Sequence, residues 1–266
     1  MSKFVVVVFP DEAKAYQATR ALKELHAEGG LTLYGTAVIT KDANGRFAVK
    51  EAADVGPLGT AVGALVGGLV GVVGGPVVAL AGVTGGALIG GLMDMFNYGV
   101  SEDFVGKVSN ELGRGKTAVV AEIVEDWTTP LDTRMEALGG MVLRTWRADF
   151  EDEQIANEVS ARQVDFEQLR IEYAQANAEA KAKLKAKVDN AKQDLEDAEK
   201  RLQAKIDALD AELEAKIAAL EKQIADAQAE AKEKLKKRIA SLRAEYEARS
   251  AKLKQAWALT KEALAA

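Results

Sequence analysis

One segment of the chain is both rich in glycine and free of charge. No charged residue occurs between Asp54 and Asp94. Glycine recurs at four-residue intervals in two runs, which consist of Gly59, Gly63, Gly67, Gly71 and Gly75, and of Gly82, Gly86 and Gly90. In a helix each glycine costs roughly 1 kcal/mol relative to alanine, so a contact must compensate. Because a row of glycines lets a second backbone approach closely, the pattern predicts a glycine zipper over residues 55–93.

The length of this segment favours a helical hairpin. A single membrane helix needs about 20 apolar residues, and the charge-free run is nearly twice as long. Gly74-Gly75-Pro76 divides it into halves at residues 58–75 and 77–93. Each half would extend about 26 Å, against a hydrocarbon core of about 30 Å. Two environments stay open: the hairpin contacts lipid, or partner subunits bury it inside a soluble oligomer.

The C-terminal part of the chain lacks both residues that commonly break helices. No glycine follows Gly140 and no proline follows Pro130, and from about Asp152 onward the composition is typical of coiled coils and long solvated helices. Residues 151–266 are therefore predicted to form a very long helix or coiled coil, which would extend about 170 Å if unbroken. The pair Asp189-Asn190 is a candidate bend.

An apolar stripe runs along this predicted helix with a mean spacing of about 3.65 residues, which favours a straight or slightly right-handed bundle. The residues expected to pack in it are Leu195, Leu202, Ile206, Leu209, Leu213, Ile217, Leu220, Ile224, Leu235, Ile239 and Leu242. A narrow stripe on a charged helix needs a partner helix. We expect that partner to be a second copy of the chain, with a solvated single helix as the alternative.

The residues on either side of the glycine segment follow an α+β pattern. Strands are predicted at residues 4–9, 31–41, 46–51, 116–125 and 141–147, and helices after Asp11, after Ser101 and at residues 131–138. The order βαββ, insert, αβ predicts a ferredoxin-like domain over residues 1–54 and 94–150, with residues 55–93 inserted as the zipper hairpin. The long helix forms the third part, residues 151–266.

Composition limits the function classes. The net charge of −6, spread evenly along the chain, argues against a nucleic-acid-binding protein. The chain has no cysteine, which excludes disulfides and thiol chemistry and fits a reducing cytoplasm. The N-terminal apolar run lacks the features of a signal peptide. These observations predict a cytoplasmic location, associated with the inner membrane through the zipper.

No pattern of catalytic or ligand-binding residues is found. Gly113-Arg114-Gly115-Lys116-Thr117 has only part of a phosphate-binding loop and leads from a predicted helix into a strand, the reverse of that motif. His26 is the only histidine, so a histidine metal site is not expected. We therefore predict no catalytic residue, no metal, no cofactor and no small-molecule substrate.

Several motifs resemble those of a known family. They are Phe9-Pro10-Asp11-Glu12-Ala13, the glycine zipper, residues 98–104 (Tyr-Gly-Val-Ser-Glu-Asp-Phe) and residues 139–145 (Gly-Gly-Met-Val-Leu-Arg-Thr). By the order of these motifs along the chain, residues 1 to about 150 resemble a bacterial family of unknown function. Its members are described as predicted membrane proteins, some of them stress-associated. The resemblance implies membrane association through the glycine zipper and no established activity.

Together these features predict a non-enzymatic, self-assembling structural protein. The expected product is a homo-oligomeric scaffold at the cytoplasmic membrane face, held by the zipper and by long-helix packing, with the protein itself and membrane lipid as partners. The first 150 residues are expected to fold independently of the tail. The alternative is a membrane channel or pore lined by zipper hairpins.

Overall fold

The computed structural model of the chain describes residues 2–52, 56–73, 78–79, 98–147 and 150–265. The chain divides into two compact units. The sheet unit comprises residues 1–149 and 212–242, and the bundle unit comprises residues 150–211 and 243–266. The helical region therefore does not form one separate domain, because residues 212–242 lie in the sheet unit.

The sheet unit is built around an antiparallel sheet of five strands. They are β1 (Lys3–Phe9), β2 (Leu31–Lys41), β3 (Phe47–Glu51), β5 (Thr117–Glu125) and β6 (Met141–Trp146), in the spatial order β3-β2-β5-β1-β6. The two-residue β4 (Val78–Ala79) adds a parallel strand beside β3. The predicted α+β class is confirmed.

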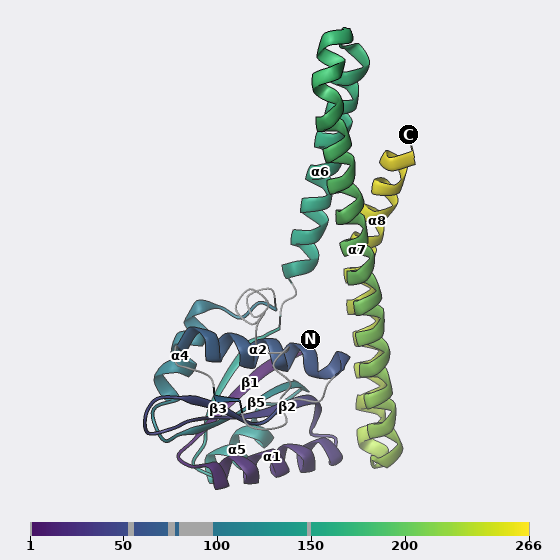
Figure 1. Cartoon of the computed structure of the whole chain (residues 1–266). Coiled ribbons are helices and arrows are strands. Elements are labelled where there is room, and N and C mark those ends of the chain that lie inside the picture. Colours follow the sequence, from purple (N-terminus) through teal and green to yellow (C-terminus); the bar gives the residue numbers. More distant parts are fainter. Residues whose placement is uncertain (1, 53–55, 74–77, 80–97, 148–149, 266) are drawn as a thin grey trace. The chain divides into compact units, whose positions relative to one another are not determined.

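Four helices cover the two faces of this sheet (Figure 1). On one face α1 (Glu12–Ala27) and α5 (Thr129–Ala137) pack on Val5, Val7 and Phe9 of β1. On the other face α2 (Pro57–Val73) and α4 (Glu102–Glu111) pack on the alternate residues of the same strand, Phe4 and Val6. The run of valines in β1 is thus explained by burial on both sides.

Local signals in the sequence begin and end these elements as predicted. The Asp11 side chain accepts a hydrogen bond from the Lys14 amide at 2.8 Å and caps α1. Ser101 caps α4 in the same way through the Phe104 amide. Gly45 has a φ of 83° in the turn between β2 and β3, a conformation that glycine adopts without strain.

The ferredoxin-like topology is not confirmed. In that fold the second strand of the hairpin lies between the first two strands, whereas here β5 pairs with both β1 and β2, and β3 pairs with the outer side of β2. The predicted order of elements along the chain is correct, but a hairpin strand can pair on either side of its neighbour. In this chain α4 returns to the sheet and places β5 in the gap between β1 and β2.

The first half of the glycine segment forms α2, and this helix is part of the sheet unit's core. Ala61, Val62, Leu65 and Leu69 are buried against the sheet. The second half of the predicted hairpin lies almost entirely outside the described residues, so the zipper as a pair of helices is not confirmed. Among the described helices, none combines the length and the apolar character needed to cross a membrane.

The prediction of one very long helix is wrong, because the C-terminal region folds into three helices. They are α6 (Phe150–Gln175), α7 (Ala178–Asp226) and α8 (Ala229–Ala265). The chain turns at Ala176-Asn177 and at Ala227-Gln228. The proposed bend at Asp189-Asn190 is also wrong, since both residues lie within α7.

The first turn has an identifiable cause. The Asn177 side chain accepts a hydrogen bond from the Ala180 amide at 3.0 Å, and its carbonyl accepts one from the Lys181 amide at 2.8 Å. Asparagine is among the best residues for beginning a helix in this way. A chain without glycine or proline can therefore still reverse direction, because a capping side chain replaces the lost helical hydrogen bonds.

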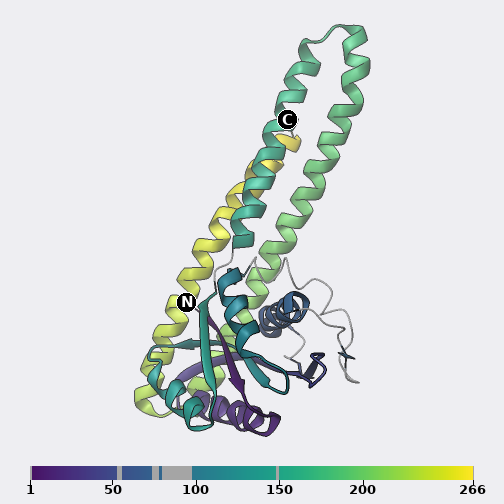
Figure 2. The same ribbon diagram turned by 90° about the vertical axis from the view of Figure 1, so that its left-hand side faces the viewer.

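The bundle unit packs three helical segments of this one chain together. Arg201 and Lys205 of α7 lie 3.0 Å from Glu158 and 3.6 Å from Asp152 of α6, so α6 and α7 are antiparallel (Figure 2). Arg249 of α8 also pairs with Asp152, at 2.7 Å. Phe166, Leu195 and Ala263, one residue from each helix, form a buried cluster. The partner that covers this part of the apolar stripe is thus the same chain, and a second copy is not required.

Candidate functional site

The most unusual side chain of the sheet is a buried carboxylate. Glu122 lies on β5 between Ala121 and Ile123, and all three are fully buried. Burying an isolated charge costs several kcal/mol, so such a group needs partners that are themselves well placed.

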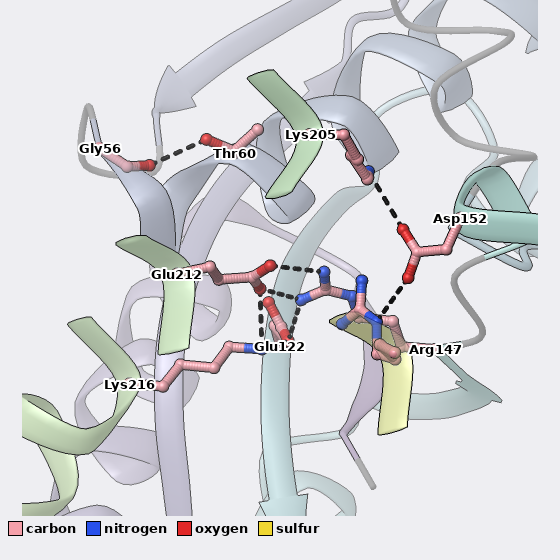
Figure 3. Close-up of polar contacts among 9 residues, drawn as sticks. Gly56, Thr60, Glu122, Arg147, Asp152, Lys205, Glu212 and Lys216 are labelled. Carbon is pink, nitrogen blue, oxygen red and sulfur yellow. Dashed lines mark hydrogen bonds and ion pairs between the residues drawn. The ribbon is translucent and has the colours of Figure 1, made fainter. Parts of the chain in front are cut away.

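Three charged side chains surround Glu122 (Figure 3). Arg147, just after β6, donates to Glu122 Oε1 from Nη1 at 2.8 Å, and Lys216 of α7 donates to the same oxygen at 2.7 Å. Glu212, one turn before Lys216, accepts from Arg147 Nη2 at 3.1 Å and lies 3.0 Å from Lys216 Nζ. We call these four residues the ion-pair network. Its two positive and two negative charges sum to zero.

Two tyrosine rings complete the surroundings of the network. Lys216 Nζ lies 4.7 Å from the centre of the Tyr34 ring, and Arg147 Cζ lies 4.7 Å from the centre of the Tyr98 ring. The face of an aromatic ring attracts a cation, and the attraction is stronger away from water. Each cation is therefore held between a carboxylate and a ring.

The electrostatics keep both carboxylates ionised. Burial alone would raise the pKa of Glu122, but Arg147 and Lys216 outweigh it and hold this pKa below the ordinary value. Burial alone would also raise the pKa of Glu212, but the same two cations hold it far below the ordinary value. A general acid or base works best with a pKa near the working pH. The network is therefore suited to hold α7 on the sheet rather than to transfer protons.

A second polar cluster fixes the tip of the α7–α8 hairpin. Gln223 donates to the Leu31 carbonyl at 2.8 Å and accepts from the Thr32 hydroxyl at 2.9 Å. Arg238 of α8 donates to the Thr32 hydroxyl at 2.9 Å and to Asp126 at 2.7 Å. A side chain on each arm of the hairpin is thus bonded to the same threonine at the start of β2.

His26 has a structural place beside this cluster. Its Nδ1 accepts a hydrogen bond from the Leu33 amide at 3.1 Å. Burial, followed by the charges of Arg238 and Lys222, lowers the pKa of His26, so the ring is neutral at pH 7 and can act as this acceptor. Among the described residues, no group of His, Cys, Asp and Glu side chains could hold a metal ion.

The predicted zipper glycines occupy different environments in α2. Gly59 and Gly67 are buried, Gly63 is half-buried and Gly71 is exposed. A Cβ added to Gly63 would meet no atom within 4 Å, so no tight contact requires this glycine in the described structure. The close approach lies instead at Gly35 of β2. The members of the predicted zipper outside the described residues are Gly75, Gly82, Gly86 and Gly90.

The predicted stripe is divided between the two units. Its buried members are Leu195, Leu202, Ile206, Leu209, Leu220, Leu235 and Leu242. Its half-buried members are Leu213, Ile217, Ile224 and Ile239. Within residues 212–226 the most buried positions of α7 include Glu212, Lys216 and Gln223. In the sheet unit, α7 therefore presents polar residues to the sheet beside its apolar stripe.

Sequence reasoning missed the ion-pair network and the Gln223 cluster. One signal was present, because Glu122 is the only charged residue between Thr117 and Val124. Glu212, Lys216 and Gln223 gave no signal, since they resemble the many other polar residues of a charged helix. Only the fold brings them to the sheet.

Comparison with known proteins adds one finding. Residues 57–160 match the profile of a family described as "Protein of unknown function (DUF1269)". No curated protein and no solved structure matches the chain. The matched segment contains Glu122 and Arg147 but ends before Glu212 and Lys216. The ion-pair network thus joins a segment similar to that family with a segment outside the match.

Proposed function

We propose that the chain is a non-enzymatic structural protein that assembles into a homo-oligomeric scaffold. The observation that carries the proposal is an apolar patch on the bundle unit. Val164 and Ile171 of α6 are 68% and 47% exposed, and Leu259 of α8 is 42% exposed. Such side chains on an otherwise charged helical surface mark a contact site for another protein.

The three residues lie on two helices that contact each other. Val164 and Ile171 are seven positions apart, which places them on the same face of α6. The Gln163 side chain donates to the Leu259 carbonyl at 3.3 Å, so the α8 backbone at Leu259 lies next to α6 at the residue before Val164. We call these three residues the bundle patch.

Charge favours a second copy as the partner of the bundle patch. From Phe150 to Gln175, α6 carries seven acidic and two basic residues, whereas residues 243–265 of α8 carry five basic and three acidic residues. A two-fold axis parallel to the helices would place α6 of one copy opposite α8 of the other. The acidic helix of each copy would then face the basic helix of its partner.

The site chemistry supports a structural role. Both carboxylates of the ion-pair network are ionised and neutralised by two cations, and α2 uses its apolar side chains on the sheet. A pore lined by α2 would have to expose Val62 and Leu65, which are fully buried. We therefore prefer a scaffold to a channel.

The assembly is tested by measuring the particle mass with light scattering. One chain has a mass of 28.4 kDa, and we expect the purified protein to be larger. Replacing Val164 and Ile171 with glutamate is expected to reduce the mass at least twofold. The matched control replaces two exposed residues of α7, Ala182 and Ala186, with glutamate. This variant is expected to have the particle mass of the wild-type protein. A wild-type mass of 28.4 kDa at all concentrations would contradict the proposal.

We also propose that the scaffold contacts the cytoplasmic face of the inner membrane through the glycine-rich segment 55–93. The support is the composition of that segment and the resemblance of residues 1 to about 150 to predicted membrane proteins. In cell fractionation the protein is expected to sediment with membranes in high salt and to be released by detergent. Recovery of all the protein in the soluble fraction at high salt would contradict the membrane contact and leave the oligomer intact.

A further inference from the structure

The strand β6 lies at an edge of the sheet. Among the described residues it pairs only with β1, from Lys3 opposite Trp146 to Val8 opposite Met141. The Arg147 amide donates to the Ser2 carbonyl at 3.1 Å. Because hydrogen-bonded pairs alternate along an antiparallel ladder, Thr145, Leu143 and Met141 bond to β1. The N–H and C=O groups of Val142, Arg144 and Trp146 therefore point away from the sheet.

This edge lacks the features that usually prevent pairing. β6 contains no proline, glycine or register shift. Arg144 does not block it, because its guanidinium is bonded to Glu125 at 2.8 Å and to Asp132 at 2.6 Å. At the opposite edge β2 and β3 have a register shift, and only the two residues of β4 follow. Among the described strands, β6 is thus the edge open to another strand.

Large apolar side chains are exposed on the same strand. Met141 is 50% exposed and Trp146 is 58% exposed. Lys3 Nζ lies 4.6 Å from the centre of the Trp146 ring. Burying these side chains would add apolar contact to the backbone hydrogen bonds of a new strand pair.

We propose that β6 pairs with β6 of a second copy, antiparallel and centred on Leu143, so that two sheets become one. This inference rests on the proposed self-association and adds an interface separate from the bundle patch. Hydrogen bonding allows only registers in which the outward N–H and C=O groups of the two strands meet, so the two-fold axis must pass through a single residue. Centring on Arg144 would set two arginines opposite each other, which is unfavourable. Centring on Thr145 would leave three residues with no opposite residue in β6, namely Met141, Val142 and Leu143.

The register centred on Leu143 separates the two arginines and leaves only Trp146 opposite a residue outside β6. It places Val142 opposite Arg144, Met141 opposite Thr145, and Trp146 opposite Gly140 of the second copy. Gly140 has no side chain to obstruct the indole, and a Cβ there would overlap the Phe9 ring, so a larger residue does not fit. A tryptophan across from a glycine covers the exposed backbone of that glycine.

The absence of cysteine makes the register directly testable by oxidation with copper phenanthroline. Two Leu143→Cys chains should form a disulfide, because the opposed residues of a non-hydrogen-bonded pair lie about 4.5 Å apart at Cα. Met141→Cys and Thr145→Cys chains should crosslink when mixed and remain uncrosslinked when alone. Crosslinking of Thr145→Cys alone would establish a different register and overturn this one.

A variant that removes one outward donor tests the pairing itself. Val142→Pro lacks the N–H that points away from β1 and keeps every bond to β1, so the particle mass should fall about twofold. Val142→Ala removes the side chain, keeps the donor and should keep the mass. If both variants keep the wild-type mass and Leu143→Cys does not crosslink, the β6 interface is wrong while self-association stands. A monomeric wild-type protein would overturn both proposals.

Discussion

Lys216 Nζ lies 2.7 Å from Glu122 Oε1, and both side chains are fully buried although 94 positions separate them in the chain. The contact joins a central strand to a helix far along the sequence. Since separating the two side chains would leave each charge buried without this partner, the ion-pair network favours the placement of α7 on the sheet.

Lys216→Met is expected to destabilise the sheet unit by about 3–5 kcal/mol, because it leaves a buried net negative charge. Urea unfolding followed by circular dichroism measures the change in the free energy of unfolding. Lys222→Met removes an exposed lysine of the same helix and is expected to change it by less than 1 kcal/mol.

A double variant tests whether Glu122 and Lys216 interact with each other. Glu122→Gln combined with Lys216→Met removes one charge of each sign, so its destabilisation should be smaller than the sum of the two single changes. Additive losses would show that Glu122 and Lys216 act independently, contrary to the geometry.

The network also predicts how stability depends on pH. The pKa values of Glu122 and Glu212 lie below the ordinary value of 4.5, so their contribution is present above about pH 4.5 and is lost as the pH falls toward the folded-state values. The wild-type free energy of unfolding is therefore expected to fall more steeply between pH 4.5 and 3 than that of the Glu122→Gln, Lys216→Met variant. Parallel curves would contradict this assignment.

Two glycines are expected to respond in opposite directions. A Cβ on Gly35 would lie 3.2 Å from Val62 Cγ2 and 3.3 Å from the Leu58 carbonyl oxygen, so Gly35→Ala is expected to cost about 1–3 kcal/mol. A Cβ on Gly63 meets nothing within 4 Å, and Gly63→Ala is expected to stabilise α2 by about 0.5–1 kcal/mol. Thermal unfolding measures the stability change of each variant. Loss of assembly in Gly63→Ala would instead support the predicted zipper.

The reversal between α6 and α7 depends on Asn177. Asn177→Ala removes the cap of α7 and is expected to cost about 1 kcal/mol in urea unfolding. Asn190→Ala, at an exposed position inside α7, is the matched control and is expected to stabilise by a few tenths of a kcal/mol. If Asn190→Ala destabilised the protein more than Asn177→Ala, the chain would instead turn at Asn190.

Local signals made the strands, the capped helices and the Asn44-Gly45 turn predictable, because each depends on a few neighbouring residues. The strand order was not predictable in this way, since the sequence of β3 is equally compatible with either side of β2. The two asparagines show the same limit. Asparagine favours a helix start, yet Asn177 caps α7 through the Ala180 amide whereas Asn190 lies inside α7.

The site was the least predictable part. The apolar stripe predicted helices that pack on a partner, but its regular spacing gave no sign that the positions of α7 that face the sheet are polar. The pairing of Glu212 and Lys216 with Glu122 depends on a hairpin that returns to the first unit. A pattern read within one helix cannot contain that information.

The division of the chain into discontinuous units has a consequence for synthesis on the ribosome. The sheet unit needs residues 212–242, so Glu122 and Arg147 are translated long before Glu212 and Lys216. At about 5–20 residues per second, roughly 5–20 s separate the end of β6 from the completion of the α7–α8 hairpin. During that interval Glu122 has Arg147 as a partner but lacks Lys216, and the ion-pair network is completed only when the α7–α8 hairpin has been made.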